Sequence, residues 1–120
     1  MASKDWIPLS ERSDKNISFT NDNLSIACVL SYYNGSRYIK QQLQSIINQK
    51  IPRINLSIYI SDDSSNEIFP NLKDLNLTDY KKHNIFYKKS SKNKGYTKNF
   101  LNSLDSIDSK FDYFCFSDQD

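Results

Sequence analysis

The sequence predicts an α/β fold in which helices cover both faces of a parallel sheet. Short apolar runs rich in β-branched and aromatic residues alternate with stretches of helical periodicity, and turn-forming residues separate them. This alternation is typical of βαβ units, whose strands run parallel. The strands are expected at Ser25–Leu30, Leu56–Ile60, Asn84–Lys88 and Asp112–Phe116.

Two helices are predicted from apolar residues spaced three or four apart. The first runs from Arg37 to Gln49 and ends before Pro52, and the second follows a turn at residues 93–95. A weaker helical stretch precedes the third strand and is broken at Pro70. The expected inner faces are Ile39, Leu43, Ile46 and Ile47 in the first helix, and Phe100, Leu101, Leu104 and Ile107 in the second.

A chain of 120 residues accommodates one compact domain. Residues 1–24 are polar and lack sustained periodicity, so they are expected to form a flexible leader before a domain at 25–120. Trp6, Ile7 and Leu9 are the leader residues that could dock on that domain.

The composition narrows the range of partners. A net charge of +2 with 25% charged residues shows no basic stripe, so no nucleic acid partner is expected. No apolar run is long enough to span a bilayer and no secretory signal is recognisable, which favours the cytoplasm, with the inner face of the membrane as an option. Cys28 and Cys115 each lie in an apolar run and are expected to be small buried residues.

Polar residues cluster where the predicted strands end. Ligands of open parallel sheets bind outside the carboxyl ends of the strands, where the loops converge. These residues are Ser31, Tyr33 and Asn34 after the first strand, Asp62 and Asp63 after the second, and Asp118 and Asp120 after the fourth.

The residues at these strand ends are of the types that a nucleotide-binding site requires. Tyr33 offers a flat ring for a base and Asp63 an acceptor for the imino hydrogen of the base. Asp118 and Asp120 supply the hard oxygen ligands that Mg²⁺ or Mn²⁺ prefers, with phosphate oxygens completing the shell. With two glycines the chain has no glycine-rich phosphate loop, so phosphate is expected to be held through a metal ion.

Each of these residues also has a purely structural interpretation. Asp62 and Asp63 could cap the next helix, because Asp is a preferred residue at helix starts. Tyr33 could be a core aromatic residue, and Asp118 and Asp120 could form a solvated chain end.

Four stretches resemble family 2 glycosyltransferases in their order and approximate spacing. They are VLSYYNGSRYIKQQLQSIINQ, IYISDDSS, NKGYTKNF and DYFCFSDQD, and together they make residues 25–120 similar to that family. The ending FSDQD looks most like bacterial rhamnosyltransferases and related polysaccharide transferases.

The resemblance implies an A-type glycosyltransferase fold, of which this chain would be the nucleotide-binding half. It implies that Ser31, Tyr33 and Asp63 contact the base of a nucleotide-sugar donor. Asp118 would approach the ribose and the metal, and Asp120 would bind the metal, which is Mn²⁺ or Mg²⁺.

The loop before the second helix resembles the family less specifically than the other stretches do. Asn93, Gly95 and Lys98 resemble positions where the family keeps polar residues facing the donor, so Lys98 is a candidate nucleotide-sugar ligand.

The reaction implied is an inverting sugar transfer for bacterial surface polysaccharide. The donor would be a UDP- or dTDP-sugar, and the acceptor of the full-length relative a saccharide or a lipid-linked one. The general base of the family lies beyond the carboxylate motif, so no catalytic residue is assigned within residues 1–120.

Two other classes of protein remain as alternatives. The chain could be a truncated, catalytically silent fragment with at most weak nucleotide binding. A phosphate-accepting receiver domain also carries paired Asp residues at strand ends, but its acidic pair would follow the first strand, whereas Leu30 is followed by Ser-Tyr-Tyr.

Overall fold

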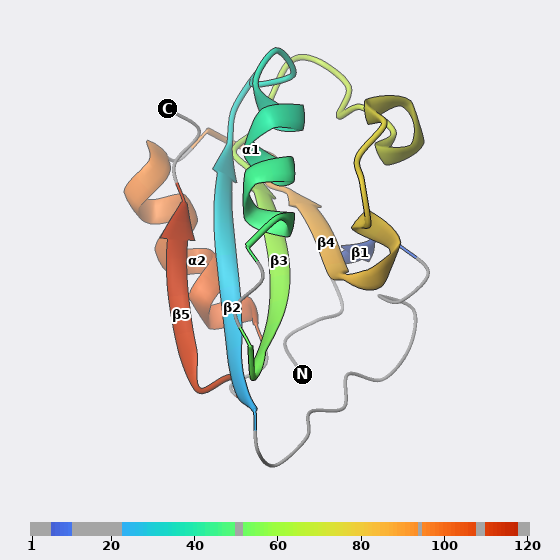
Figure 1. Cartoon of the computed structure of the whole chain (residues 1–120). Helices are drawn as coiled ribbons and strands as arrows, with labels where there is room; N and C mark the ends of the chain where they lie inside the picture. Colours follow the sequence, from blue (N-terminus) through green and yellow to red (C-terminus); the bar gives the residue numbers. More distant parts are fainter. Residues whose placement is uncertain (1–5, 11–22, 50–51, 94, 108–109, 118–120) are drawn as a thin grey trace.

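A computed structural model describes residues 6–10, 23–49, 52–93, 95–107 and 110–117. In these residues five strands form one sheet in the order β1-β4-β3-β2-β5, with α1 in front of the sheet and α2 behind it (Figure 1). The pairs β4–β3, β3–β2 and β2–β5 are parallel, whereas β1 pairs with β4 antiparallel. The elements are β1 (Ile7–Pro8), β2 (Leu24–Tyr32), α1 (Ile39–Ile47), β3 (Ile54–Asp62), two 3₁₀ turns (Leu72–Leu75 and Tyr80–Lys82), β4 (Asn84–Lys89), α2 (Gly95–Ser106) and β5 (Tyr113–Ser117).

The predicted fold class is confirmed, with differences in the extent of the elements. Strands β2 and β3 are longer than predicted, and α1 begins at Ile39 instead of Arg37. The weak helical stretch near Pro70 is a pair of 3₁₀ turns. On α2, Leu101 is 53% exposed, so its assignment to the inner face is wrong.

Two apolar cores flank the sheet because successive side chains on a strand point to opposite faces. Cys28, Leu30 and Tyr32 of β2 pack on the α1 side with the four inner residues of that helix. Ala27 and Val29 pack on the α2 side, around Tyr59 of β3. Both central strands are therefore covered on both faces, as parallel sheets require.

Residues 6–10 of the predicted leader dock on the domain, the option that the sequence left open for Trp6, Ile7 and Leu9. Trp6 is 4% exposed, its ring meets that of Tyr59 edge-on at 5.0 Å, and its Nε1 donates to Ser106 Oγ at 3.1 Å. Ile7 pairs with Tyr87 of β4. Trp6 thus anchors this segment to the α2-side core. The remaining leader residues, except 23 and 24, lie outside the described parts.

Strand β5 has no neighbour on its outer side among the described residues. Tyr113 is 60% exposed and Phe114 38% exposed. Cys115 is exposed as well, so the expectation that both cysteines are buried is correct for Cys28 and wrong for Cys115. An apolar run predicts a strand but not whether that strand lies at an edge.

Neither described helix has the length and apolar character needed to cross a membrane.

Trp6→Ala is expected to destabilise the fold by about 3–5 kcal/mol, because it removes a buried aromatic side chain and leaves a cavity. Urea denaturation followed by circular dichroism measures the change. Ile7→Ala is the matched control: Ile7 is 56% exposed, and its loss is expected to cost less than about 1 kcal/mol. Equal stability of Trp6→Ala and the wild type would show that this segment does not contribute to the fold.

Candidate functional site

The strand order places a topological switch point between β2 and β5. From β2 the chain crosses over α1 to β3, and from β4 it returns through α2 to β5 on the opposite side of β2. The two connections cover opposite faces of the sheet (Figure 1), and they leave it at the carboxyl ends of β2 and β4. In open α/β sheets the ligand-binding crevice lies outside the carboxyl ends of the strands at such a switch point, and this expected region is called the crevice.

Asp62 has a structural role at this edge. Its side chain is fully buried, its Oδ1 accepts the Ser65 N–H at 2.9 Å, and its Oδ2 accepts the Tyr87 hydroxyl at 2.6 Å. Burial, and then the hydrogen bond to Asp62, raise the pKa of Tyr87. Asp62 therefore shapes the turn after β3 and ties it to β4.

Asp63 points to the other side of the sheet edge, at the start of α2. Its Oδ2 accepts the Gly95 N–H at 2.8 Å, and its backbone carbonyl accepts Asn93 Nδ2 at 3.3 Å. Gly95 has a φ of +80°, a conformation that favours glycine. The carboxylate is 3% exposed and compensates the positive end of the helix. Helix capping by Asp63 was one of the two predicted alternatives, but the capped helix is α2 and not the segment that follows β3.

Ser31 lies at the end of β2 on the α2 side and is 6% exposed. Its register partner Ser61 belongs to a buried network, in which Ser61 Oγ donates to Asn99 Oδ1 at 2.8 Å and accepts from Ser103 Oγ at 2.7 Å. The network fixes α2 beneath the carboxyl ends of β2 and β3.

The loops after β2 and β3 are joined by three polar side chains. Asn34 Oδ1 accepts the Asn66 N–H at 2.8 Å, and Ser65 Oγ accepts the Asn34 N–H at 2.7 Å. Glu67 accepts the Ser36 N–H at 3.0 Å and the Tyr32 hydroxyl at 3.4 Å. The Ser36 N–H lowers the pKa of Glu67, while burial and then the Glu67 charge raise that of Tyr32. The two loops therefore act as one unit.

Glu67 and Ser65 were not singled out from the sequence. Their contacts lie more than thirty residues away along the chain, and nothing in the local pattern indicates a partner at that distance.

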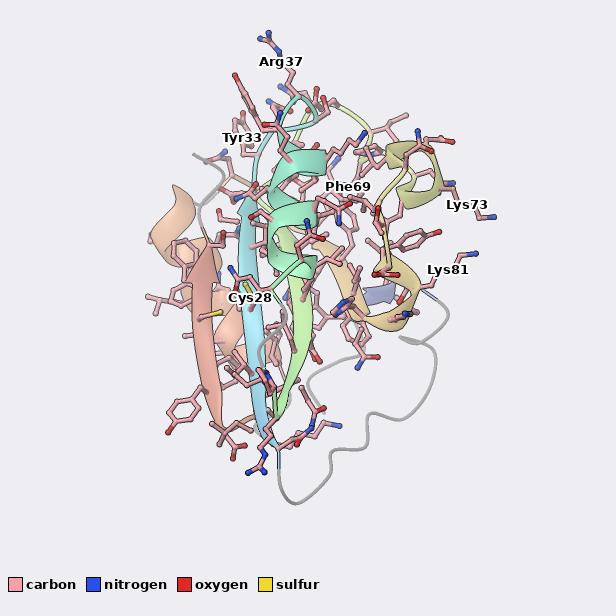
Figure 2. The ribbon with its side chains drawn as sticks, in the orientation of Figure 1. Cys28, Tyr33, Arg37, Phe69, Lys73 and Lys81 are labelled. Carbon is pink, nitrogen blue, oxygen red and sulfur yellow. The ribbon has the colours of Figure 1, made fainter. Side chains whose placement is uncertain are left out.

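Tyr33, Arg37 and Lys98 provide exposed groups at the same end of the molecule. Tyr33 is 41% exposed just beyond β2, and Figure 2 shows Arg37 near it above α1. Lys98 is exposed in the first turn of α2. An aromatic ring and two cations thus flank the loops after β2 and the start of α2.

The predicted metal ligands Asp118 and Asp120 lie outside the described residues. They follow β5. Its last residue, Ser117, pairs with Leu30 of β2, and Ser117 Oγ accepts a hydrogen bond from Gln42 Nε2 of α1 at 3.5 Å. Within the described residues, no three His, Cys, Asp or Glu side chains form a group that could hold a metal ion. The paired carboxylates at the end of β5 have the hard donor chemistry that Mg²⁺ or Mn²⁺ requires.

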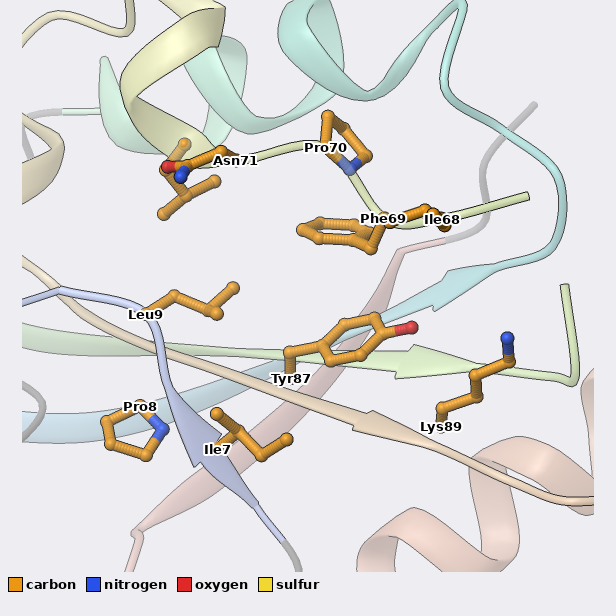
Figure 3. A pocket seen from close by; sticks show the side chains of 10 residues that line it. Ile7, Pro8, Leu9, Ile68, Phe69, Pro70, Asn71, Tyr87 and Lys89 are labelled. Atoms are coloured by element: carbon orange, nitrogen blue, oxygen red, sulfur yellow. The ribbon is translucent and has the colours of Figure 1, made fainter.

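A separate groove of about 850 Å³ lies on the β1 and β4 side of the sheet (Figure 3). The rings of Phe69 and Tyr87 pack in a tilted arrangement with their centres 4.5 Å apart, and Leu9 and Lys89 also line the groove. It contains none of the residues predicted to bind a nucleotide. Tyr87 connects this groove to the crevice through its bond to Asp62.

Comparison with known proteins agrees with this geometry. The model of the family described as Glycosyl transferase family 2 matches residues 27–120. The dTDP-rhamnosyl transferase RfbG of Shigella flexneri is 37% identical over 92 residues, which make up 76% of this chain. The chain spans about a third of the length of that relative, since the matched part is 31% of it.

The resemblance inferred from the four sequence stretches is therefore confirmed, including its rhamnosyltransferase character. Because the family match covers all of the sheet except β1 and the first residues of β2, the chain belongs to glycosyl transferase family 2.

Proposed function

We propose that the crevice above β2, β3 and β5 binds a nucleoside diphosphate sugar together with a divalent cation, as part of a transferase that builds bacterial surface polysaccharide. The observation that carries this proposal is that Ser31 and Tyr33 lie at the carboxyl end of β2, and Asp63 at that of its parallel neighbour β3, in a family 2 sheet. The relative's name, a dTDP-rhamnosyl transferase, supports dTDP as the nucleotide.

The base is assigned to Tyr33 and Asp63. The exposed Tyr33 ring offers a stacking surface, and the Asp63 carboxylate accepts the N3 hydrogen that uracil and thymine share. A carboxylate can accept about four hydrogen bonds, so the bond from Gly95 and a bond from a base are compatible. Ser31 is assigned to the floor of the site because it is 6% exposed at the end of β2.

The diphosphate is assigned to the side of the crevice nearest β5. Asp118 and Asp120 would hold the cation, and Lys98 would add a positive charge from the first turn of α2. When bound, the cation would offset the charge that grows on the departing diphosphate. The sugar transfer itself is proposed for the whole protein. The chain matches 31% of the length of its relative, which is about a third.

Binding of dTDP is expected to depend on Mn²⁺. Titration calorimetry of the folded chain with dTDP, UDP and GDP, with and without Mn²⁺, measures this. Removal of the metal or the double change Asp118→Ala and Asp120→Ala should weaken binding by about tenfold or more. Binding that is equally tight without metal would contradict the assignment of Asp118 and Asp120, and a folded chain that binds none of the three would contradict the nucleotide site.

Asp63→Asn is expected to weaken dTDP binding by about tenfold, because it replaces a charged acceptor with a neutral one. Tyr87→Phe is the control: it removes the 2.6 Å bond to the neighbouring Asp62 and should lower stability by about 1 kcal/mol. Its affinity for dTDP should remain within about twofold of the wild type. If Asp63→Asn lowers only the stability, Asp63 is a helix cap and not a ligand.

The alternative of a catalytically silent fragment is tested separately. Release of labelled sugar from dTDP-rhamnose to a saccharide acceptor is measured with the isolated chain. Detectable transfer would eliminate the silent fragment, while metal-dependent dTDP binding without transfer would favour a binding unit.

A further inference from the structure

The two cysteines of the chain lie side by side on neighbouring strands. Cys28 of β2 and Cys115 of β5 are register partners in a parallel pair, so their side chains project from the same face of the sheet. Neighbouring strands are about 4.8 Å apart. That separation lies within the Cα distance of about 4.4–6.8 Å that a disulfide requires. The register therefore places the two residues at a backbone separation compatible with a disulfide.

The two thiols differ in access and acidity. Cys28 is 4% exposed in the α1-side core, whereas Cys115 is exposed at the open side of β5. A hydrogen bond from Cys28 lowers the pKa of Cys115 to about 7, against the opposing effect of partial burial. The same hydrogen bond, followed by burial and by the Cys115 charge, raises the pKa of Cys28. Cys115 is thus the more accessible and the more acidic thiol of the pair.

We propose that Cys115 and Cys28 form a redox-active dithiol, in which a small hydroperoxide oxidises Cys115 and Cys28 then closes an intramolecular disulfide between β5 and β2. The inference does not depend on the proposed nucleotide site. It assigns a role to an exposed cysteine at a position where packing alone would not require one.

The chemistry balances with hydrogen peroxide as the oxidant. The Cys115 thiolate attacks one peroxide oxygen, the O–O bond breaks, and the departing hydroxide takes up a proton to become water. Cys115 is now a sulfenic acid and has lost the charge that held the proton on Cys28. Cys28 then attacks the Cys115 sulfur, the S–O bond breaks, and a second water leaves with the Cys28 proton. One peroxide is reduced and one dithiol is oxidised.

The bond would join the two strands that flank the switch point. Cys28 lies three residues before Ser31, and Cys115 lies three residues before Asp118. A disulfide at this level would fix the spacing of β2 and β5 directly below the crevice.

The reduced chain is treated with one equivalent of hydrogen peroxide, unfolded, alkylated with iodoacetamide and weighed by intact mass spectrometry. The expected product is a monomer about 2 Da lighter that takes up no alkyl group, and whose digest contains a peptide linking Cys28 to Cys115. Alkylation of both thiols, or a disulfide between two chains, would overturn the proposal. So would conversion of Cys115 to a sulfinic acid while Cys28 remains reduced.

Single variants separate the two roles. In Cys28→Ala, peroxide should leave Cys115 as a sulfenic acid that dimedone traps. In Cys115→Ala, the buried Cys28 should oxidise at least about tenfold more slowly than the wild-type pair. Circular dichroism checks folding, and Cys28→Ser replaces Cys28→Ala if the alanine variant does not fold. Oxidation of Cys115→Ala at the wild-type rate would contradict the assignment of Cys115 as the first thiol to react.

Discussion

Parallel pairing on both sides of β2 is the constraint on which the rest of the structure depends. A parallel neighbour cannot be reached by a tight turn, so each connection has to cross a face of the sheet. With β3 on one side and β5 on the other, α1 and α2 cover opposite faces. Both cores, the buried central strands and the position of the switch point follow from this arrangement.

Hydrogen bonds between residues distant in sequence then join the loops at the carboxyl ends of β2 and β3. Asn34, Ser65 and Glu67 link the loops after β2 and β3, while Ser61, Asn99 and Ser103 fix α2 below them. Nearly all of these side chains are short and polar, and they form hydrogen bonds with the backbone or with one another. Such satisfied networks position a site precisely enough for ligand recognition because each member restrains the next.

The sequence was sufficient for the fold class, the order of the elements and the end of the sheet where polar residues gather. Periodicity and turn residues carry that information locally. It was insufficient for roles that depend on distant partners. Asp62 and Asp63 are adjacent in sequence, yet one bonds Tyr87 of β4 and the other bonds Gly95 of α2. Trp6 and Glu67 likewise gain their roles only from contacts across the fold.

The carboxylate at the start of α2 has an electrostatic consequence. In many doubly wound proteins the first turn of a helix attracts phosphate through its unpaired N–H groups. Here Asp63 already bonds the first of these groups, so a phosphate brought to α2 would meet a like charge instead of an open dipole. The start of α2 therefore presents a carboxylate where such helices present an unpaired N–H group.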